Sequence, residues 1–235
     1  PAVRPARRPS THAPDVDPCE GLRAGRLPDA GRQGKTLMNT APISRAEGCP
    51  HHVRREEIVD YQTYEDEREA FRQAAMAIKA PRRIHLGDHL TFLFENHDTM
   101  RYQIQEIMRA EKIVREAAIA EELETYNGLL GGSGQLGCAL LIEIDDEAER
   151  RPLLEAWLGL QECLYAELAG GSRVRAEYDS SQVGRGRLSA VQYLKFTLPE
   201  APVRLGSDFP VLELSVGLDS ETRTAMSADL AATFI

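Results

Sequence analysis

A segment near the middle of the chain places several polar side chains where a strand turns into a helix. It runs L-F-E-N-H-D-T-M-R-Y-Q-I-Q-E-I-M-R-A-E, from Leu93 to Glu111. Asn96, Asp98 and Thr99 are of the types that accept hydrogen bonds from the N–H groups at a helix start. A helix N-terminus that follows a strand also favours a bound anion. The segment therefore indicates either simple helix capping, which is the commoner use of such residues, or a small anion site.

The helix that follows this turn carries a carboxylate on its apolar side. At 100° per residue, five apolar side chains fall on one face. They are Met100, Ile104, Ile107, Met108 and Val114. Glu111 lies near the centre of that face, and a buried carboxylate is costly unless it is paired or protonated. Two interpretations stay open: an i,i+4 ion pair with Arg115 at the edge of the core, or a functional carboxylate that faces a pocket with a shifted pKa.

We take the polar side chains of this segment as one candidate pocket. Arg101 and Gln105, one helical turn apart, flank the apolar face and are expected to reach toward the anion site. Arg101 would hold an anionic group, and Glu106 or Glu111 would act as general acid or base. The full candidate set is Glu95, Asn96, His97, Asp98, Arg101, Gln105, Glu106 and Glu111.

Metal binding is the other chemistry that these residue types allow. A mixed site of His97, Glu95 and Glu106 has suitable ligands but no recognised spacing. His85 and His89 lie about 13 Å apart along an extended strand, at ~3.3 Å per residue, so they share a metal only if the chain bends between them. We therefore expect neither a metal nor another cofactor.

The rest of the chain predicts the elements that position this segment. Helical periodicity indicates helices over 56–78, 99–126 and 147–160, and a short closing helix with Met226, Leu230 and Phe234. Alternating or apolar runs indicate strands over 83–86, 89–95, 138–144, 163–169, 173–178, 189–198 and 211–217. Short turns join most of these strands, which favours antiparallel pairing. The predicted fold class is α+β: a mostly antiparallel sheet, with strand 138–144 at its centre and the long and shorter helices on one face.

The first 50 residues differ in composition from the remainder. They hold 8 of the 13 prolines and show no apolar periodicity, which predicts a disordered arm before a single domain over 51–235. Met38 begins M-N-T-A-P-I-S and is a candidate natural start. Within the arm's end, Cys49-Pro50-His51-His52 offers metal ligands, but no further ligands follow at zinc spacing.

Charge and hydropathy exclude several classes of function. Residues 1–50 hold 8 Lys+Arg and 5 Asp+Glu, a balance of +3, whereas the remainder holds 20 and 32, a balance of −12. An acidic body argues against a surface that follows nucleic-acid phosphates. No apolar run approaches the ~18 residues of a membrane span, and the start lacks an apolar signal segment. Four cysteines without a C-x-x-C pair fit a reducing cytoplasm, where we expect the protein to act.

Two stretches carry a resemblance to a known family. They are R-R-I-H-L-G-D-H-L-T-F-L-F-E-N-H-D-T-M-R-Y-Q-I-Q-E, from Arg82 to Glu106, and E-L-E-T-Y-N, from Glu122 to Asn127. They resemble the bacterial family called domain of unknown function 3501, over roughly residues 61–198. The E-N-x-D-T-x-R-x-Q-x-Q-E core is fairly specific because it fixes many polar identities in a short window.

This resemblance implies a setting but brings no catalytic residues, because the family has no assigned activity. Its genes often lie beside those for rubrerythrin and an iron–sulfur oxidoreductase, which implies a redox or peroxide-stress role and makes these proteins the implied partners. The family usually has Arg at the position of His97, which argues against His97 as a dedicated metal ligand.

Three functions stay open. The preferred one is a non-catalytic accessory or binding protein of a cytoplasmic redox or peroxide-stress module, because no nucleophile–base arrangement is evident. The second is an enzyme with an anion-binding pocket at the strand–helix turn, using Arg101 with Glu106 or Glu111. The third is a metal-binding protein that uses His97 and nearby carboxylates. The most useful observation is whether Glu95, Arg101, Glu106 and Glu111 converge on one cavity.

Overall fold

The computed structural model describes residues 51–180 and 186–232, all within the compact unit Thr40–Ile235. The predicted arm over 1–50, with Met38, lies outside the described residues, as does Phe234. Within the described part, helices are combined with strands that all pair antiparallel, so the predicted α+β class is confirmed.

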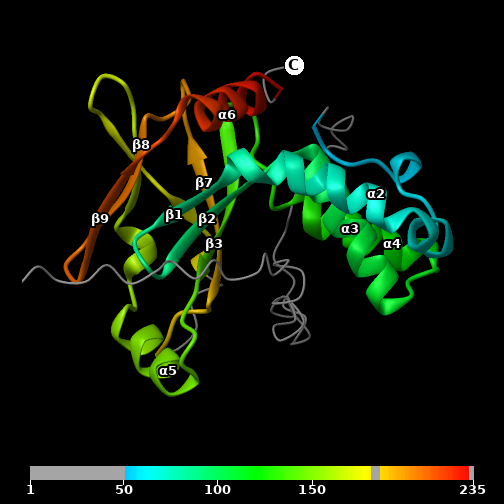
Figure 1. The fold of residues 1–235 in the computed structure, drawn as a ribbon, viewed down its shortest axis with the longest axis horizontal. Helices are drawn as coiled ribbons and strands as arrows, with labels where there is room; N and C mark the ends of the chain where they lie inside the picture. Colours follow the sequence, from blue (N-terminus) through cyan, green and yellow to red (C-terminus); the bar gives the residue numbers. More distant parts are fainter. Residues whose placement is uncertain (1–50, 181–185, 233–235) are drawn as a thin grey trace, which may run out of the picture. The chain divides into compact units, whose positions relative to one another are not determined.

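The described strands form two sheets rather than the single predicted one (Figure 1). The first sheet has the order β1 (Arg83–Leu86), β2 (Leu90–Glu95), β3 (Gln135–Ile142), β7 (Val191–Thr197) and β6 (Glu177–Tyr178). The second has the order β5 (Arg173–Arg175), β4 (Leu164–Glu167), β8 (Arg204–Phe209) and β9 (Leu212–Gly217). The apolar strand β3 lies at the centre of the first sheet, as predicted. Only Ala176 separates β5 from β6, so one stretch of chain passes directly from the second sheet into the first.

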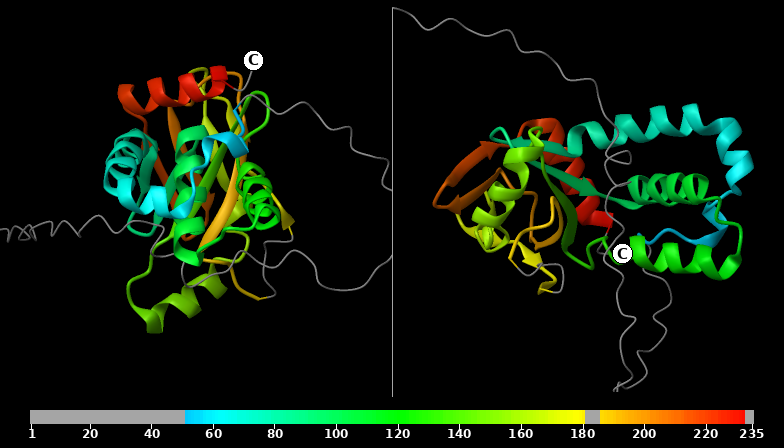
Figure 2. Two further views of the ribbon diagram at one scale, coloured as in Figure 1. Left: turned by 90° about the vertical axis from the view of Figure 1, so that its right-hand side faces the viewer. Right: turned by 90° about the horizontal axis from the view of Figure 1, so that it is seen from below.

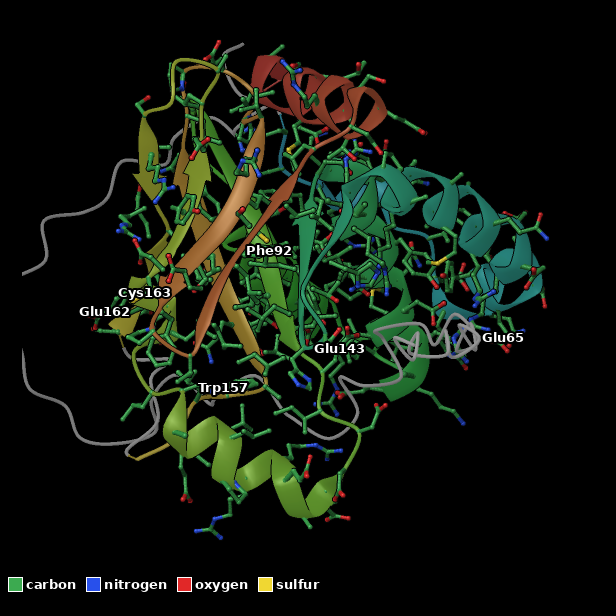
Figure 3. All side chains as sticks on the ribbon, turned by 60° about the vertical axis from the view of Figure 1, so that its left-hand side comes forward. Glu65, Phe92, Glu143, Trp157, Glu162 and Cys163 are labelled. Atoms are coloured by element: carbon green, nitrogen blue, oxygen red, sulfur yellow. The ribbon has the colours of Figure 1, made fainter. Side chains whose placement is uncertain are left out.

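The main hydrophobic core lies between the two sheets. Alternate side chains of β2, namely Leu90, Phe92 and Phe94, belong to it together with Leu164 and Leu205 of the second sheet. Figure 3 shows Phe92 in the interior between the sheets. Helix α5 (Glu147–Ala156) and helix α6 (Ser220–Ala232) lie at opposite ends of this core and add Leu154, Met226 and Leu230 to it.

Strand β2 is buried on both of its faces. Thr91, Leu93 and Glu95 point away from the core between the sheets, but helix α2 (Tyr61–Lys79) and the short helix η3 (Ala80–Arg82) lie against the strand. Glu95, the last residue of β2, is therefore carried into the interior by the strand.

Three helices lie beside the sheets, and the second and third of them enclose a second, smaller core. Helix α2, helix α3 (His97–Glu111) and helix α4 (Glu116–Asn127) lie side by side next to the sheets (Figure 2). The short helix η2 (Arg55–Glu57) precedes α2, which starts at its cap Asp60 and so begins later than the predicted residue 56. The buried residues of the second core are Val53, Ile58, Met100, Ile104, Met108, Ile119, Leu123, Tyr126 and Leu130.

The predicted long helix over 99–126 is wrong, because the chain breaks between α3 and α4. Lys112 adopts a left-handed conformation with φ of 53°, and the Ile113 N–H donates to the Met108 carbonyl over 2.9 Å. This 6→1 hydrogen bond is the Schellman motif that ends many helices. The break leaves Glu111 exposed at the end of α3, so the apolar face predicted around it does not form there.

Strand β8 has no counterpart among the predicted strands. Its sequence R-L-G-S-D-F interrupts the apolar alternation with Gly206 and Asp208. Gly206 is required by packing, since a Cβ there would lie 2.4 Å from the Tyr165 ring of the neighbouring β4. Close packing across the sheet therefore requires glycine at position 206, although glycine in the interior of a strand is unfavourable and is a weak signal for one.

Among the helices that the structure describes, none combines the length and the apolar composition that crossing a membrane requires.

Candidate functional site

The strand–helix turn forms a capping box. The Asn96 side chain accepts a hydrogen bond from the Thr99 N–H over 3.0 Å, and the Thr99 hydroxyl accepts one from the Asn96 N–H over 2.8 Å. This reciprocal pair satisfies two backbone donors that the helix itself leaves unused. Capping by Asn96, the simpler of the two interpretations of the turn, is therefore what the structure shows.

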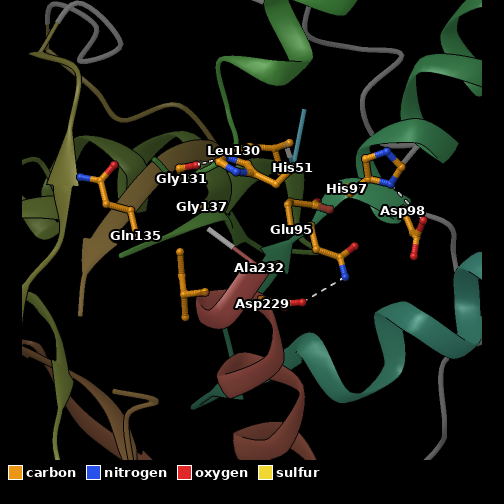
Figure 4. Close-up of a pocket in the computed structure, with 12 residues that line it drawn as sticks. His51, Glu95, His97, Asp98, Leu130, Gly131, Gln135, Gly137, Asp229 and Ala232 are labelled. Carbon is orange, nitrogen blue, oxygen red and sulfur yellow. Dashed lines mark hydrogen bonds and ion pairs between the residues drawn. The ribbon is translucent and has the colours of Figure 1, made fainter. Parts of the chain in front are cut away.

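A cavity of about 200 Å³ opens beside this turn (Figure 4). It lies where the start of α3, the loop over 128–134 and the end of α6 meet. Glu95, Asn96, His97 and Asp98 of the candidate set line it. The chain brings to them His51, Gly131, Gly137, Asp229 and Ala232, among others.

Glu95 is the buried carboxylate of this cavity. The residue is 7% exposed, and its Oε2 atom accepts no hydrogen bond from the described residues. Burial raises the pKa of Glu95, although the charges of Lys79 and Arg82 and a hydrogen bond from Thr99 act in the opposite direction. A buried acceptor without a donor costs about 1–3 kcal/mol, so a ligand that donates to Oε2 would relieve an existing cost.

One wall of the cavity is held by a buried ion pair. The Arg82 guanidinium donates to both carboxylate oxygens of Asp229 over 2.8 Å, and both side chains are 10% exposed. The Asn96 amide donates to the same carboxylate over 3.2 Å. These bonds fasten α6 to η3 and to the first turn of α3, which fixes the wall relative to Glu95.

The opposite wall is the glycine-rich loop. A His51 ring N–H donates to the Gly131 carbonyl over 2.6 Å. The loop lies directly on β3, because a Cβ at Gly137 would be 2.2 Å from the Leu129 carbonyl oxygen. Only glycine allows that approach, so the loop's position depends on the residue type at 137.

His97 bridges two carboxylates at the edge of the cavity. Its Nε2 lies 3.0 Å from Glu57 Oε1, and its Nδ1 lies 3.1 Å from Asp98 Oδ1. Both ring nitrogens are therefore engaged, and the side chain links η2 to the start of α3. In this arrangement His97 presents no nitrogen lone pair toward the cavity.

Arg101 and Gln105 face away from the cavity, contrary to the expectation that they reach toward the turn. The Arg101 Nε donates to the Glu57 carbonyl over 3.0 Å, and its guanidinium lies 5.5 Å from the Phe71 ring centroid. The Gln105 amide pairs with the backbone of Val59 through bonds of 2.8 and 3.2 Å. Because the side chains on this face of α3 meet the segment 57–59, they hold that segment rather than a ligand.

Glu106 and Glu111 also lie outside the cavity lining. Glu106 accepts hydrogen bonds from the Tyr64 hydroxyl over 2.6 Å and from two Arg68 nitrogens over 2.8 and 3.0 Å. Burial opposes ionisation of Glu106, but these bonds and the charges of Arg68 and Arg109 outweigh it and lower its pKa. Glu111 is exposed, and no ion pair joins it to Arg115 in the described part of the chain. Glu95, Arg101, Glu106 and Glu111 therefore do not converge on one cavity.

The histidines do not form a metal centre in the described residues, where no group of three or more His, Cys, Asp and Glu side chains is arranged to hold an ion. The β1–β2 turn does bend between His85 and His89, but their rings face different partners. His85 Nδ1 lies 2.9 Å from the Thr91 hydroxyl, and His89 Nδ1 lies 3.1 Å from the Glu143 carbonyl oxygen.

Several cavity residues were absent from the candidate set. The five glycines between 128 and 137 were a usable signal for the loop, because such density indicates close backbone approach. The sequence marks His51 only as a possible metal ligand, beside Cys49 and His52. Nothing local marks Asp229 or Ala232, which reach the cavity through the tertiary packing of α6.

Comparison with known proteins agrees with this fold. The chain is similar to a crystal structure of a protein of unknown function from Burkholderia pseudomallei K96243, with 28% sequence identity and a TM-score of 0.70. The similarity covers 76% of this chain and 98% of that one. No curated protein matches this chain. A family model described as "Protein of unknown function (DUF3501)" matches residues 52–230, so the chain belongs to the DUF3501 family, as the E-N-x-D-T-x-R-x-Q-x-Q-E core predicted.

Proposed function

We propose that this chain is a non-catalytic binding protein that takes a small ligand in the cavity beside Glu95. The single observation that carries the proposal is Glu95, a residue that lines the cavity and has one enclosed carboxylate oxygen without a hydrogen-bond donor. Buried polar groups in folded proteins are almost always satisfied, so an exception at a cavity calls for an explanation, and a bound ligand supplies one.

The chemistry around the cavity favours binding over catalysis. The described lining holds no Ser, Thr, Cys or Lys that could act as a nucleophile beside a base. The nearby thiol of Cys138 is buried, and burial together with the Glu95 charge raises its pKa well above the usual range, so it is not a thiolate at neutral pH. Glu106, which would serve as the acid or base of the enzyme alternative, is occupied by Tyr64 and Arg68.

The size of the cavity limits the ligand. Pockets for drug-sized molecules and cofactors measure roughly 300–1,000 Å³. A cavity of about 200 Å³ suits a molecule smaller than a nucleotide or a flavin.

The setting that we propose rests on the family resemblance. Genes of the family often lie beside those for rubrerythrin and an iron–sulfur oxidoreductase, so we place the binding function in a cytoplasmic redox or peroxide-stress module. In that setting the protein would hold a small molecule for a partner that performs the redox step. We expect the chain to co-purify with either partner. We expect a substitution that fills the cavity to abolish this co-purification, and that result would support the setting.

A filled cavity tests the binding function itself. Ala232 lines the cavity at the exposed end of α6, whereas the exposed neighbour Ala231 does not, so Ala232→Phe and Ala231→Phe form a matched pair. We expect a thermal-shift screen of small polar compounds to yield ligands that stabilise the wild type and Ala231→Phe but not Ala232→Phe. A ligand at a hundred times its Kd adds about 2.7 kcal/mol, which raises the Tm by several degrees.

Two results would overturn the proposal. The first is the absence of any ligand whose effect depends on Ala232, provided that Ala232→Phe alone unfolds at the wild-type temperature. The second is chemical conversion of a bound compound, followed by mass spectrometry, because the protein would then be an enzyme.

A further inference from the structure

The charges around the cavity restrict the class of ligand. Glu95, Asp98 and Asp229 contribute carboxylates to the lining, and its described residues include no Lys or Arg. A ligand that carries an anionic group would be repelled at short range. The lining is therefore rich in hydrogen-bond acceptors and poor in positive charge.

The three carboxylates differ in how far they are already satisfied. Asp229 receives two bonds from Arg82 and one from Asn96, so the fold itself compensates its charge. The Asp98 side chain is 54% exposed and lies 3.1 Å from the His97 ring, so solvent access and His97 compensate its charge. Glu95 is both buried and short of a donor, so its carboxylate is the least compensated of the three, and its Oε2, which has less than 1 Å² of accessible surface, can receive a ligand's donor only once the side chain turns toward the cavity.

Lys79 is the cation that attracts the Glu95 carboxylate most strongly, but it donates no hydrogen bond to that carboxylate. Lys79 is 2% exposed and attracts the Glu95 carboxylate through space, but its ammonium makes no hydrogen bond to any described residue. The Lys79 Nζ lies 5.0 Å from the Tyr102 ring centroid, which supplies a cation–π contact instead. Lys79 does not line the cavity, so the described lining supplies Glu95 with no cationic donor.

We infer that the ligand is a small organic cation, with a primary ammonium or guanidinium group that donates to Glu95. This inference rests on the proposed binding function and names its ligand class. Such a group supplies several N–H donors and a positive charge, and charge-assisted hydrogen bonds are the stronger kind. Asp98, the exposed carboxylate of the lining, is the candidate acceptor for a second donor of the same molecule.

A metal ion suits the cavity less well than an organic cation. The described residues provide no cluster of three ligands, both ring nitrogens of His97 are engaged, and Asp229 is paired with Arg82. A divalent ion would have to displace these bonds before it gained coordination, whereas an ammonium group needs only an acceptor.

The test is calorimetric titration of the full-length protein with ethylammonium, 1,4-diaminobutane and methylguanidinium. The uncharged 1,4-butanediol, acetate and the chlorides of zinc and calcium serve as comparisons. Glu95→Gln removes the acceptor charge, and Glu111→Gln makes the same change at an exposed glutamate away from the cavity. We expect at least one of the organic cations to bind the wild type and Glu111→Gln, and to bind Glu95→Gln more weakly by on the order of tenfold or more.

Asp98→Asn gives an independent readout should Glu95→Gln fold poorly, because Asp98 is exposed. We expect that change to weaken 1,4-diaminobutane severalfold. Equal binding to the wild type and Glu95→Gln, equal binding of 1,4-butanediol, or Glu95-dependent binding of zinc or calcium would overturn the ligand class. If other compounds still bind in a manner that Ala232→Phe abolishes, the binding function stands and only the ligand class falls. If no compound binds in a manner that Ala232→Phe abolishes, the binding function and the ligand class are both wrong.

Discussion

Glu95 at the end of β2 and Glu106 in the middle of α3 are buried to nearly the same extent, at 7% and 6% exposure. Their surroundings differ. Glu106 accepts bonds from Tyr64 and Arg68, and Arg109 lies within 3.5 Å of it, so its pKa is lowered. Glu95 keeps an oxygen without a donor, and its pKa is raised, chiefly by burial.

This difference shows that burial by itself does not mark a functional carboxylate. The interface of α2 and α3 supplies Glu106 with donors from within the fold, so the carboxylate joins two helices. The end of β2 supplies Glu95 with too few donors and opens onto a cavity, so the carboxylate is left for a ligand.

Replacement of Glu106 should have the largest effect on stability. Glu106→Leu leaves Arg68 and Arg109 without their shared partner, and loss of one member of a buried ion pair costs about 3–5 kcal/mol. We expect about 3 kcal/mol, because the Arg68 side chain is 33% exposed and regains some water. Glu65→Leu is the control, since Glu65 also pairs with Arg109 but is 52% exposed. Chemical denaturation should give a loss below about 1 kcal/mol for that surface pair, and equal losses would contradict the account.

Glu95→Gln should have a smaller effect of opposite sign. The folded pKa of Glu95 lies above its ordinary value of 4.5, so the folded state binds more protons than the unfolded state above that pH. Stability therefore falls as the pH rises from 4.5 through the folded pKa, and the amide removes that loss. We expect Glu95→Gln to raise the free energy of unfolding by about 1 kcal/mol at pH 8.

The gain from Glu95→Gln should disappear below pH 4.5, where the wild-type carboxyl is protonated in both states. Urea denaturation at pH 4 and pH 8 measures both parts of this expectation. A destabilised variant at both pH values would mean that the attraction between Glu95 and Lys79 outweighs the cost of burial.

The smallest effect is expected at Glu111 and Arg115. Glu111 is exposed at the end of α3, and Arg115 is the N-cap of α4, so the break in the helix separates the two. Glu111→Leu and Arg115→Leu should each change stability by less than about 0.5 kcal/mol, and the two changes should add. A coupling above that value in a double-mutant cycle would restore the ion pair that the unbroken helix predicted.

Local signals in the sequence predicted much of the fold. The bounds of β1, the central position of β3 and the cap at Asn96 follow from alternation, apolar content and capping chemistry within a few residues. Glu95, Asn96, His97 and Asp98 are consecutive, so their common place at the cavity also follows from local structure.

The remaining features depend on contacts that no local pattern contains. Lys112 takes a left-handed conformation that usually marks Gly or Asn, so the end of α3 gave no signal. Glu106 meets Arg68 across a sequence separation of 38 residues, and Asn96 meets Asp229 across 133. Helical periodicity places side chains on a face but does not say which element will cover that face. For this reason the sequence could not predict that Glu106 would be paired within the fold and that Glu95 would lie at the cavity.

A single titration experiment can follow the ionisation of both glutamates in one sample. Carbon-detected NMR of protein labelled with ¹³C at glutamate carboxyls gives the pKa of Glu95 and of Glu106, with and without 1,4-diaminobutane. We predict that Glu95 titrates above 4.5 and Glu106 below it. The diamine should lower the pKa of Glu95 and leave that of Glu106 unchanged. A Glu95 that titrates at or below 4.5, or that does not respond to the diamine while Glu106 does, would contradict the account.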